Sequence, residues 1–221
     1  MTTLVAPSHD HTTTAAGHDV RKDIQALRAV AVAAVVVYHL WPGALPGGFV
    51  GVDVFFVISG FLITTQLVRR PPSRPGDFAR FWGRRVLRLI PAVALVILAT
   101  LGGALLFMSV SQWDRVAGDA LSSMLYVENW RLIADATDYL DQNRAPSPFQ
   151  HYWSLSVEEQ YYLLWPLVTG LLAWCTRNHS RRTRTLAFGA GFGVLVLTSL
   201  VLSLVLTSSD PAQAYLSLIH I

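Results

Sequence analysis

Residues 23–40, DIQALRAVAVAAVVVYHL, decide the fold, because they form an apolar run about as long as a bilayer is thick. Two ionisable residues, Arg28 and His39, interrupt the run. At about 100° per residue, both side chains fall within roughly 20° of one helix face, about 16 Å apart along the axis. Ionisable residues inside a membrane are costly and are usually kept for function. The alternative is that each side chain only reaches for water at its own end of the helix.

The composition of the whole chain predicts an integral membrane protein. Of its 221 residues, 52% are hydrophobic and 14% are charged, whereas about 25% are charged in an average soluble domain. Stretches long enough to cross a bilayer lie at about residues 24–41, 49–68, 86–108, 155–174 and 186–208. We therefore expect an all-α, polytopic transmembrane helix bundle with five spans.

The distribution of basic residues predicts the orientation of these spans. Of the 17 basic residues, three lie in 21–28, seven in 69–88 and four in 177–184. Such segments are expected to face the cytoplasm, and the links 41–48 and 109–152 to face outward. This predicts a multi-pass protein of the inner, cytoplasmic membrane with a cytoplasmic N-terminus. The net charge of +3 then reflects topology, and no nucleic-acid partner is expected.

The remaining segments suggest three domain boundaries. Residues 1–19 are polar, without the apolar core of a signal peptide, and are expected to form a disordered cytoplasmic tail. Residues 20–208 form the membrane domain. Residues 209–221 are expected to be a truncated outer segment whose last six residues, LSLIHI, resemble read-through sequence and carry no function.

No metal site is expected. The histidines of the tail, His9, His11 and His18, have no cysteine partner, and such histidines in flexible polar tails are usually inert. The single cysteine, Cys175, can form no internal disulfide and has no motif around it that would indicate covalent catalysis.

Asp53 is an acid at the start of an otherwise apolar span. The preceding link is short, so spans one and two should be antiparallel neighbours, with Asp53 near the level of His39. A carboxylate bonded to one ring nitrogen of a histidine fixes its tautomer and makes the other nitrogen more basic. Alternatively, Asp53 only caps the N-terminus of its helix. Both readings stay open.

Glu158 is the second acidic candidate. Ser156 followed by Glu158 and Glu159 is typical of a helix start with acids in its first turn. That accounts for one glutamate as structure. The other could face the cavity beside Asp53 and His39, so we take Glu158 as a candidate for orienting the histidine.

Three arginines lie where span three enters the membrane, in the segment FWGRRVLRLIPA at 81–92. Arg84 and Arg88 are four residues apart, and Arg85 and Arg88 are three apart, so they are expected to share a helix face. Arginine forks bind phosphate oxygens in bidentate fashion. The cluster therefore predicts a phosphate site, with lipid headgroups or topology alone as the alternative.

Four motifs, in order along the chain, resemble those of the acyltransferase 3 family of integral-membrane O-acyltransferases. They are Arg28 followed after ten residues by His39, GFVGVDVFFVISGFLIT at 48–64, the Arg85 to Arg88 step before Ile90 and Pro91, and YWSLSVEEQYYLLWPL at 152–167. The resemblance implies transfer of an acyl group, commonly acetyl from cytoplasmic acetyl-CoA, to a hydroxyl of a cell-envelope carbohydrate. It also implies that His39 is catalytic and that Arg28, Arg85 and Arg88 serve the acyl donor.

A mechanism follows from the resemblance and the helix geometry together. If the arginines hold the phosphates of coenzyme A, the pantetheine arm could present its thioester near His39. His39, oriented by Asp53 or Glu158, would act as general base or accept the acyl group itself. Acyl-CoA would be a donor substrate, with no permanently bound cofactor. Expected partners are membrane lipid and an acceptor of the lipopolysaccharide, peptidoglycan or exopolysaccharide type.

Two other functional classes are alternatives to an acyltransferase. A transporter or flippase-like bundle would use buried Arg, His and Asp as an ion path, but the sequence lacks paired broken helices. An inactive scaffold would tolerate changes at Arg28 or His39. Family members carry about ten spans, so we expect this chain to be an N-terminal fragment.

Overall fold

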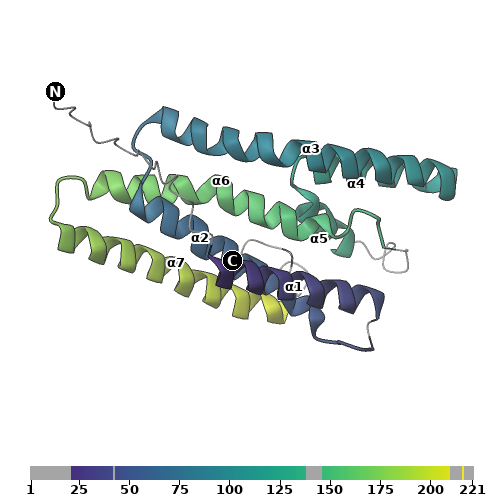
Figure 1. Ribbon diagram of the computed structural model, residues 1–221, viewed down its shortest axis with the longest axis horizontal. Helices are drawn as coiled ribbons and strands as arrows, with labels where there is room; N and C mark the ends of the chain where they lie inside the picture. The colour runs from purple at the N-terminus through teal and green to yellow at the C-terminus, as the bar shows by residue number, and fades with distance from the viewer. Residues whose placement is uncertain (1–20, 42, 138–145, 210–215, 217–221) are drawn as a thin grey trace, which may run out of the picture. The chain divides into compact units, whose positions relative to one another are not determined.

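The computed structural model describes residues 21–41, 43–137, 146–209 and 216. The described part is helical and contains no strand (Figure 1). The predictions for residues 1–19, and for nearly all of 209–221, concern residues outside the described part of the chain. The elements are α1 (Lys22–Leu40), η1 (Gly48–Val50), α2 (Gly51–Arg69), α3 (Pro75–Phe107), η2 (Val110–Gln112), α4 (Trp113–Met124), α5 (Glu128–Thr137), α6 (Tyr152–Cys175) and α7 (Arg181–Ser209).

The chain divides into two compact units, Met1–Gly51 and Val52–Ile221. In the first unit, the short helix η1 turns back onto α1. A Cβ at Gly48 would collide with the carbonyl oxygen of Ala34, and one at Gly51 with that of Ala31. Both positions therefore need glycine, because only the missing side chain allows this close approach of backbone to backbone.

Four helices of the described residues are long and apolar enough to cross a membrane: α1, η1 with α2, α3 and α7. They match the first, second, third and fifth predicted spans. The segment predicted as the fourth span is helical and long enough, as α6, but it is not among these four. The polar residues Glu158, Glu159 and Gln160 account for this, because they lower its mean hydropathy.

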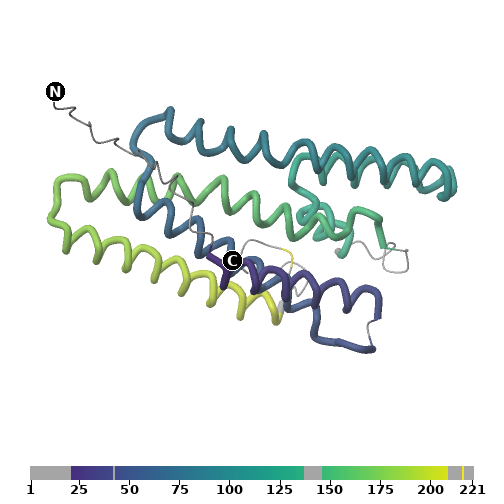
Figure 2. The backbone as a smooth tube through the Cα atoms, in the orientation of Figure 1, coloured from purple at the N-terminus to yellow at the C-terminus, as the bar shows by residue number. Residues whose placement is uncertain are grey.

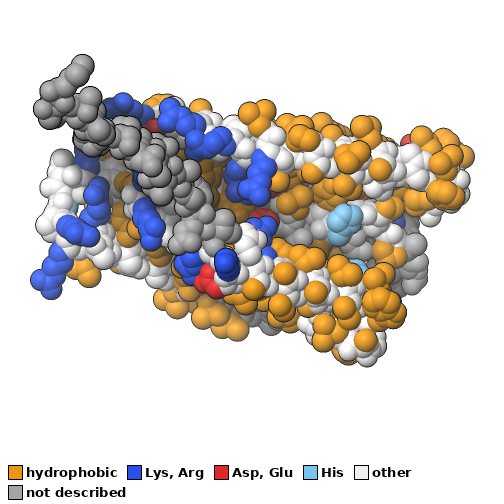
Figure 3. Space-filling view, in the orientation of Figure 1, with side chains coloured by type: hydrophobic (Ala, Val, Ile, Leu, Met, Phe, Trp, Pro, Cys, Tyr) orange, Lys and Arg blue, Asp and Glu red, His pale blue; other side chains and the backbone are white. Residues whose placement is uncertain are grey.

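In the second unit, α2, α3, α6 and α7 run up and down beside one another (Figures 1 and 2). The links from α2 to α3 and from α6 to α7 lie at the same end. Lys and Arg side chains gather at that end, and hydrophobic side chains cover most of the remaining face (Figure 3). The arrangement brings together two of the basic segments for which we expected a cytoplasmic position.

Helix α6 lies at the centre of this packing. Its aromatic side chains meet α2, α3 and α7: Tyr161 and Tyr162 pack with Ile63 and Phe81, and Trp165 stacks on Phe192 at 5.1 Å between ring centroids. A separate cluster joins α3, α4 and the start of α6 through Val93, Ile97, Ala104, Val116, Ala120, Phe149 and Tyr152. Helix α6 is thus shielded by its neighbours, and it is not among the helices that are apolar enough by themselves to span a membrane.

The segment 109–152, predicted as a long outer link, is more ordered than expected. It contains η2, α4 and α5, and α4 packs back along α3. Helices α4 and α5 are short and amphipathic, so no apolar run of span length marks them in the sequence. Of the aromatic residues in this segment, Trp113 and Trp130 are exposed, Tyr126 is half-buried, and Tyr139 lies outside the described residues.

The predicted start of the fourth helix was wrong. Helix α6 begins at Tyr152, with no acid in its first turn, so Ser156 and Glu158 lie inside the helix. Ser156 does not cap: its side chain is completely buried. The physical reason is that Phe149 and Tyr152 anchor the chain in the core one turn earlier, which extends the helix upstream of the capping pattern.

Candidate active site

An ion pair joins α3 to α6 in the interior of the second unit. Arg85 Nη2 donates to Glu159 Oε1 at 2.9 Å, and the Arg85 side chain is only 26% exposed. The guanidinium also lies over the ring of Tyr162, 3.2 Å from its centroid. Trp82, one turn before Arg85, donates its indole N–H to the carbonyl oxygen of Tyr162 at 3.2 Å. Arg85 is therefore held by an acid and an aromatic face of the same helix.

Glu158 makes a second polar connection, from α6 to α2. Its Oε1 accepts a hydrogen bond from Ser59 Oγ at 2.5 Å and another from the Tyr162 hydroxyl at 2.8 Å. Tyr162 thus links the two glutamates, since its hydroxyl contacts Glu158 while its ring lies under Arg85, the partner of Glu159. Neighbouring glutamates on α6 are engaged by different helices.

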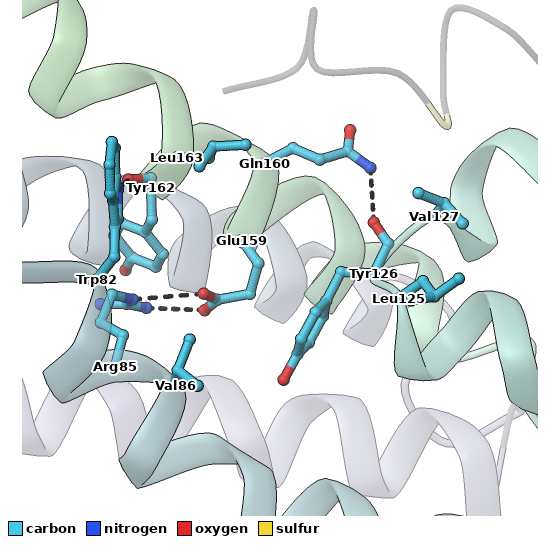
Figure 4. A pocket seen from close by; sticks show the side chains of 10 residues that line it. All are labelled: Trp82, Arg85, Val86, Leu125, Tyr126, Val127, Glu159, Gln160, Tyr162 and Leu163. Atoms are coloured by element: carbon cyan, nitrogen blue, oxygen red, sulfur yellow. Dashed lines mark hydrogen bonds and ion pairs between the residues drawn. The ribbon is translucent and has the colours of Figure 1, made fainter. Parts of the chain in front are cut away.

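A pocket of about 300 Å³ opens beside this ion pair (Figure 4). Most of its lining is apolar, and its polar groups come from α3, α6 and the link between α4 and α5. The lining residues are Trp82, Arg85, Val86, Leu125, Tyr126, Val127, Glu159, Gln160, Tyr162 and Leu163. A small pocket with a few convergent polar groups is the usual form of a ligand site.

Tyr126 occupies an unusual place in this lining. Its φ of 56° is the one positive value for a non-glycine residue in the described chain. Gln160 Nε2 fixes the turn by donating to the Tyr126 carbonyl oxygen at 2.8 Å. Burial raises the pKa of the Tyr126 phenol, and the charge of Glu159 raises it further, so the hydroxyl keeps its proton. Backbone strain of this kind persists only where the surroundings enforce it.

His39 lies in the last turn of α1, in the first unit, and is exposed. Its Nδ1 is 2.8 Å from the carbonyl oxygen of Val35. A carbonyl can only accept, so Nδ1 carries the proton and, in the neutral ring, Nε2 carries the free electron pair. The hydrogen-bond partner that fixes the tautomer is therefore a backbone carbonyl of the same helix. From the sequence we had assigned this role to Asp53 or Glu158.

Asp53 lies in the first turn of α2 and is exposed. Within the described part of the second unit it makes no hydrogen bond or ion pair. Its position at the helix start agrees with the capping alternative. Its pairing with His39, which belongs to the other unit, stays a prediction.

The arginines separate into two kinds. Arg84 and Arg88 are exposed on α3 and have no acidic partner among the described residues, whereas Arg85 is paired with Glu159. Arg28 lies in the middle of α1. The expected cluster of three open guanidiniums is therefore reduced to two on α3, because Arg85 turns toward α6.

Sequence reasoning missed several residues of this site. Glu159 was treated as structural, and Trp82, Gln160 and Tyr162 were not singled out. A signal was available for one of them: Tyr162 follows Glu158 by four residues, a spacing that places both side chains on one helix face. No such local signal links Arg85 to Glu159, 74 residues away.

No group of three or more His, Cys, Asp or Glu side chains in the described part of the chain could hold a metal ion. Cys175 is exposed at the end of α6. The polar side chains that line the pocket are those of Trp82, Arg85, Tyr126, Glu159, Gln160 and Tyr162.

Comparison with known proteins gives the family. Residues 21–214 match the model of the acyltransferase domain of the acyltransferase 3 family. YrhL of Bacillus subtilis, provisionally described as a peptidoglycan O-acetyltransferase, is 38% identical over 195 residues, which cover 87% of this chain and 30% of YrhL. The O-acetyltransferase OatA of Staphylococcus aureus is 45% identical over 152 residues, covering 67% of this chain and 24% of OatA.

A third relative is the peptidoglycan O-acetyltransferase OatA of Listeria monocytogenes, 36% identical over 193 residues, which cover 87% of this chain and 30% of that protein. This chain thus spans between 24% and 30% of the length of these relatives. No solved structure matches it. Because the matched region runs from the start of α1 to beyond the end of α7, the chain belongs to the acyltransferase 3 family.

Proposed function

We propose that the protein containing this chain is a membrane-embedded O-acyltransferase that moves an acyl group, expected to be acetyl, from cytoplasmic acyl-CoA to a hydroxyl of a cell-envelope carbohydrate. The observation that carries the proposal is the acyltransferase match over residues 21–214, which includes every candidate site residue. The names of two relatives, which refer to peptidoglycan, favour peptidoglycan as the acceptor class.

His39 is the proposed base. With Nδ1–H bonded to the Val35 carbonyl oxygen, Nε2 can accept the proton of the acceptor hydroxyl. The hydroxyl oxygen then bonds to the acyl carbon, the carbon–sulfur bond breaks, and the imidazolium returns the proton to the leaving thiolate. In the alternative route, Nε2 itself takes the acyl group and passes it on.

The donor phosphates are assigned to Arg28, Arg84, Arg85 and Arg88. Arg84 and Arg88 are open to a ligand, which favours them as the first contacts. Arg85 can join only if phosphate competes with Glu159 for its guanidinium. In this proposal, the chain lies in the cytoplasmic membrane with its N-terminus in the cytoplasm, and the acceptor hydroxyl reacts at the outer face.

The test is acetyl transfer from labelled acetyl-CoA to isolated peptidoglycan, in membranes that carry the full-length protein. His39→Ala should lower the initial rate by at least about 100-fold, the usual contribution of a general base. His179→Ala is the matched control, because His179 is also exposed and has no proposed role. Both variants are compared at equal amounts of folded protein.

Equal rates for His39→Ala and the intact protein would remove His39 as the catalyst. Transport of a labelled solute without any ester product would favour the transporter class instead. Accumulation of acylated protein after rapid quenching, lost in His39→Ala, would select the covalent route over direct transfer.

A further inference from the structure

Two buried carboxyl groups meet where α4 and α5 join. Asp119 on α4 is 1% exposed, and Glu128, the first residue of α5, is 0% exposed. Both lie outside the helices that are long and apolar enough to span the membrane. Carboxylates buried to this degree need a compensating cation, a set of hydrogen-bond donors or a proton.

The two acids are compensated differently. Arg131 Nε donates to Asp119 Oδ1 at 2.5 Å, so that acid has an ionic partner. Glu128 contacts a neutral group, the hydroxyl of Ser122, at 2.5 Å from its Oε2. The second carboxylate therefore lacks a comparable salt bridge, and an ionised Glu128 would be poorly compensated.

The hydrogen-bond pattern fits a proton on Glu128. Ser122 has one hydroxyl proton and three acceptors around its Oγ: Glu128 Oε2 at 2.5 Å and the carbonyl oxygens of Gly118 and Asp119 at 2.9 and 3.2 Å. Where Ser122 donates to one of the carbonyls, the short contact with Glu128 requires the proton of a carboxylic acid. Asp119 Oδ2 and Glu128 Oε1 also lack partners, and buried polar atoms without partners need an explanation.

The surroundings act in the same direction. Burial raises the pKa of Glu128 to about 7, and the charge of Asp119 raises it too, whereas Ser122, Arg131 and Ser123 lower it. On α4, Arg115 lies one turn before Asp119 and has contacts of its own. On α6, which packs against α5, the two glutamates are engaged by Ser59 and Tyr162 and by Arg85.

We propose that Asp119 and Glu128 form a buried acid pair that holds one proton in weakly acid solution and releases it around neutral pH, so that the junction of α4 and α5 is a proton-binding site. This site does not depend on the acyl-transfer proposal. The acid pair lies next to the pocket. The link 125–127 directly before Glu128 lines that pocket, and Val127 N–H donates to the Ser122 carbonyl oxygen at 2.8 Å. Loss of the proton leaves an uncompensated charge beneath this link.

Infrared difference spectroscopy of the full-length protein in detergent tests the proposal, because a protonated buried carboxyl has its own carbonyl band. Spectra are taken from about pH 5 to pH 9 for the intact protein and for Glu128→Gln, which keeps the shape but cannot titrate. The intact protein should show a band that is half lost near pH 7 and that is missing in Glu128→Gln. Glu159→Gln is a control for an acid outside the pair and should leave the band in place.

A second variant, Asp119→Asn, distinguishes a proton shared by the acid pair from a proton held by Glu128 alone. Removing the Asp119 charge frees Arg131, so the Glu128 band should be lost at a clearly lower pH. The titration is repeated with added NaCl and CaCl₂ and should keep its midpoint. The proposal fails if no band distinguishes the intact protein from Glu128→Gln, if Asp119→Asn leaves the midpoint unchanged, or if Ca²⁺ displaces the proton and shows the site to be a cation site.

Discussion

Two clusters of charged side chains differ in their ratio of cations to acids. One is the ion pair of Arg85 with Glu159, and the other consists of Asp119, Glu128 and Arg131. The first has one cation for one acid and borders a pocket. The second has two acids, and its one cation, Arg131, is bonded to Asp119 and not to Glu128. A buried carboxyl group can thus be stabilised by a cationic partner or by a proton, and the count of charges within each cluster indicates which.

The largest effect is expected from Arg131→Met, which removes the cation of the second cluster. Asp119 is then left buried without an ionic partner, and such a loss destabilises a protein by about 3 kcal/mol. Thermal unfolding of the full-length protein in detergent measures it. Thermal unfolding at the same temperature as the intact protein would contradict this account.

A smaller loss is expected from Glu159→Gln, which removes the acid of the first pair. The Arg85 side chain is partly exposed and also lies on Tyr162, so water and the ring offset part of the cost, leaving about 1 to 2 kcal/mol. Arg88→Gln, an exposed arginine on the same helix, is the matched control and should unfold like the intact protein.

The double variant Arg85→Gln with Glu159→Gln sharpens this point. If the two residues form one unit, its destabilisation should be less than the sum of the two single losses. Strict additivity in unfolding experiments would mean that the pair contributes no coupling energy.

The smallest effect is expected from Glu128→Gln below about pH 4.5, within about 0.5 kcal/mol, because there it replaces one neutral side chain by another in both the folded and the unfolded state. The pKa of Glu128 is raised in the folded state from 4.5 to about 7. The stability that its proton contributes is therefore complete below about pH 4.5 and lost as the pH rises to about 7. Relative to the intact protein, Glu128→Gln should thus become more stable along this range. Parallel unfolding curves of the two proteins against pH would contradict it.

Much of the fold could be predicted from the sequence. Long apolar runs specify transmembrane helices by themselves, because each such helix satisfies its own backbone hydrogen bonds. For that reason α1, α2, α3 and α7 lie where the hydropathy of the chain placed them. The fourth predicted span and the link 109–152 were harder to predict, since α4, α5 and α6 gain their stability from packing with neighbours rather than from their own apolar length.

The candidate site divides in the same way. Arg28, His39, Asp53, Glu158 and the arginines of α3 stood out as ionisable residues in or beside apolar segments. Their partners did not, since Arg85 meets Glu159, and Glu158 meets Ser59, across long separations in sequence. The hydrogen bond that fixes the His39 tautomer is local, but a sequence cannot say whether a side chain will turn to its own backbone or to a neighbour.

By itself, the sequence determined that this protein is helical, that it lies in a membrane and that it carries the motifs of an acyltransferase, because hydropathy and local spacing are properties of the chain. Only the tertiary structure decided which charges are paired, which arginines remain open, and where an acid is left to be neutralised by a proton. Those outcomes depend on burial and on distances between helices, and both arise only when segments far apart in the sequence pack together.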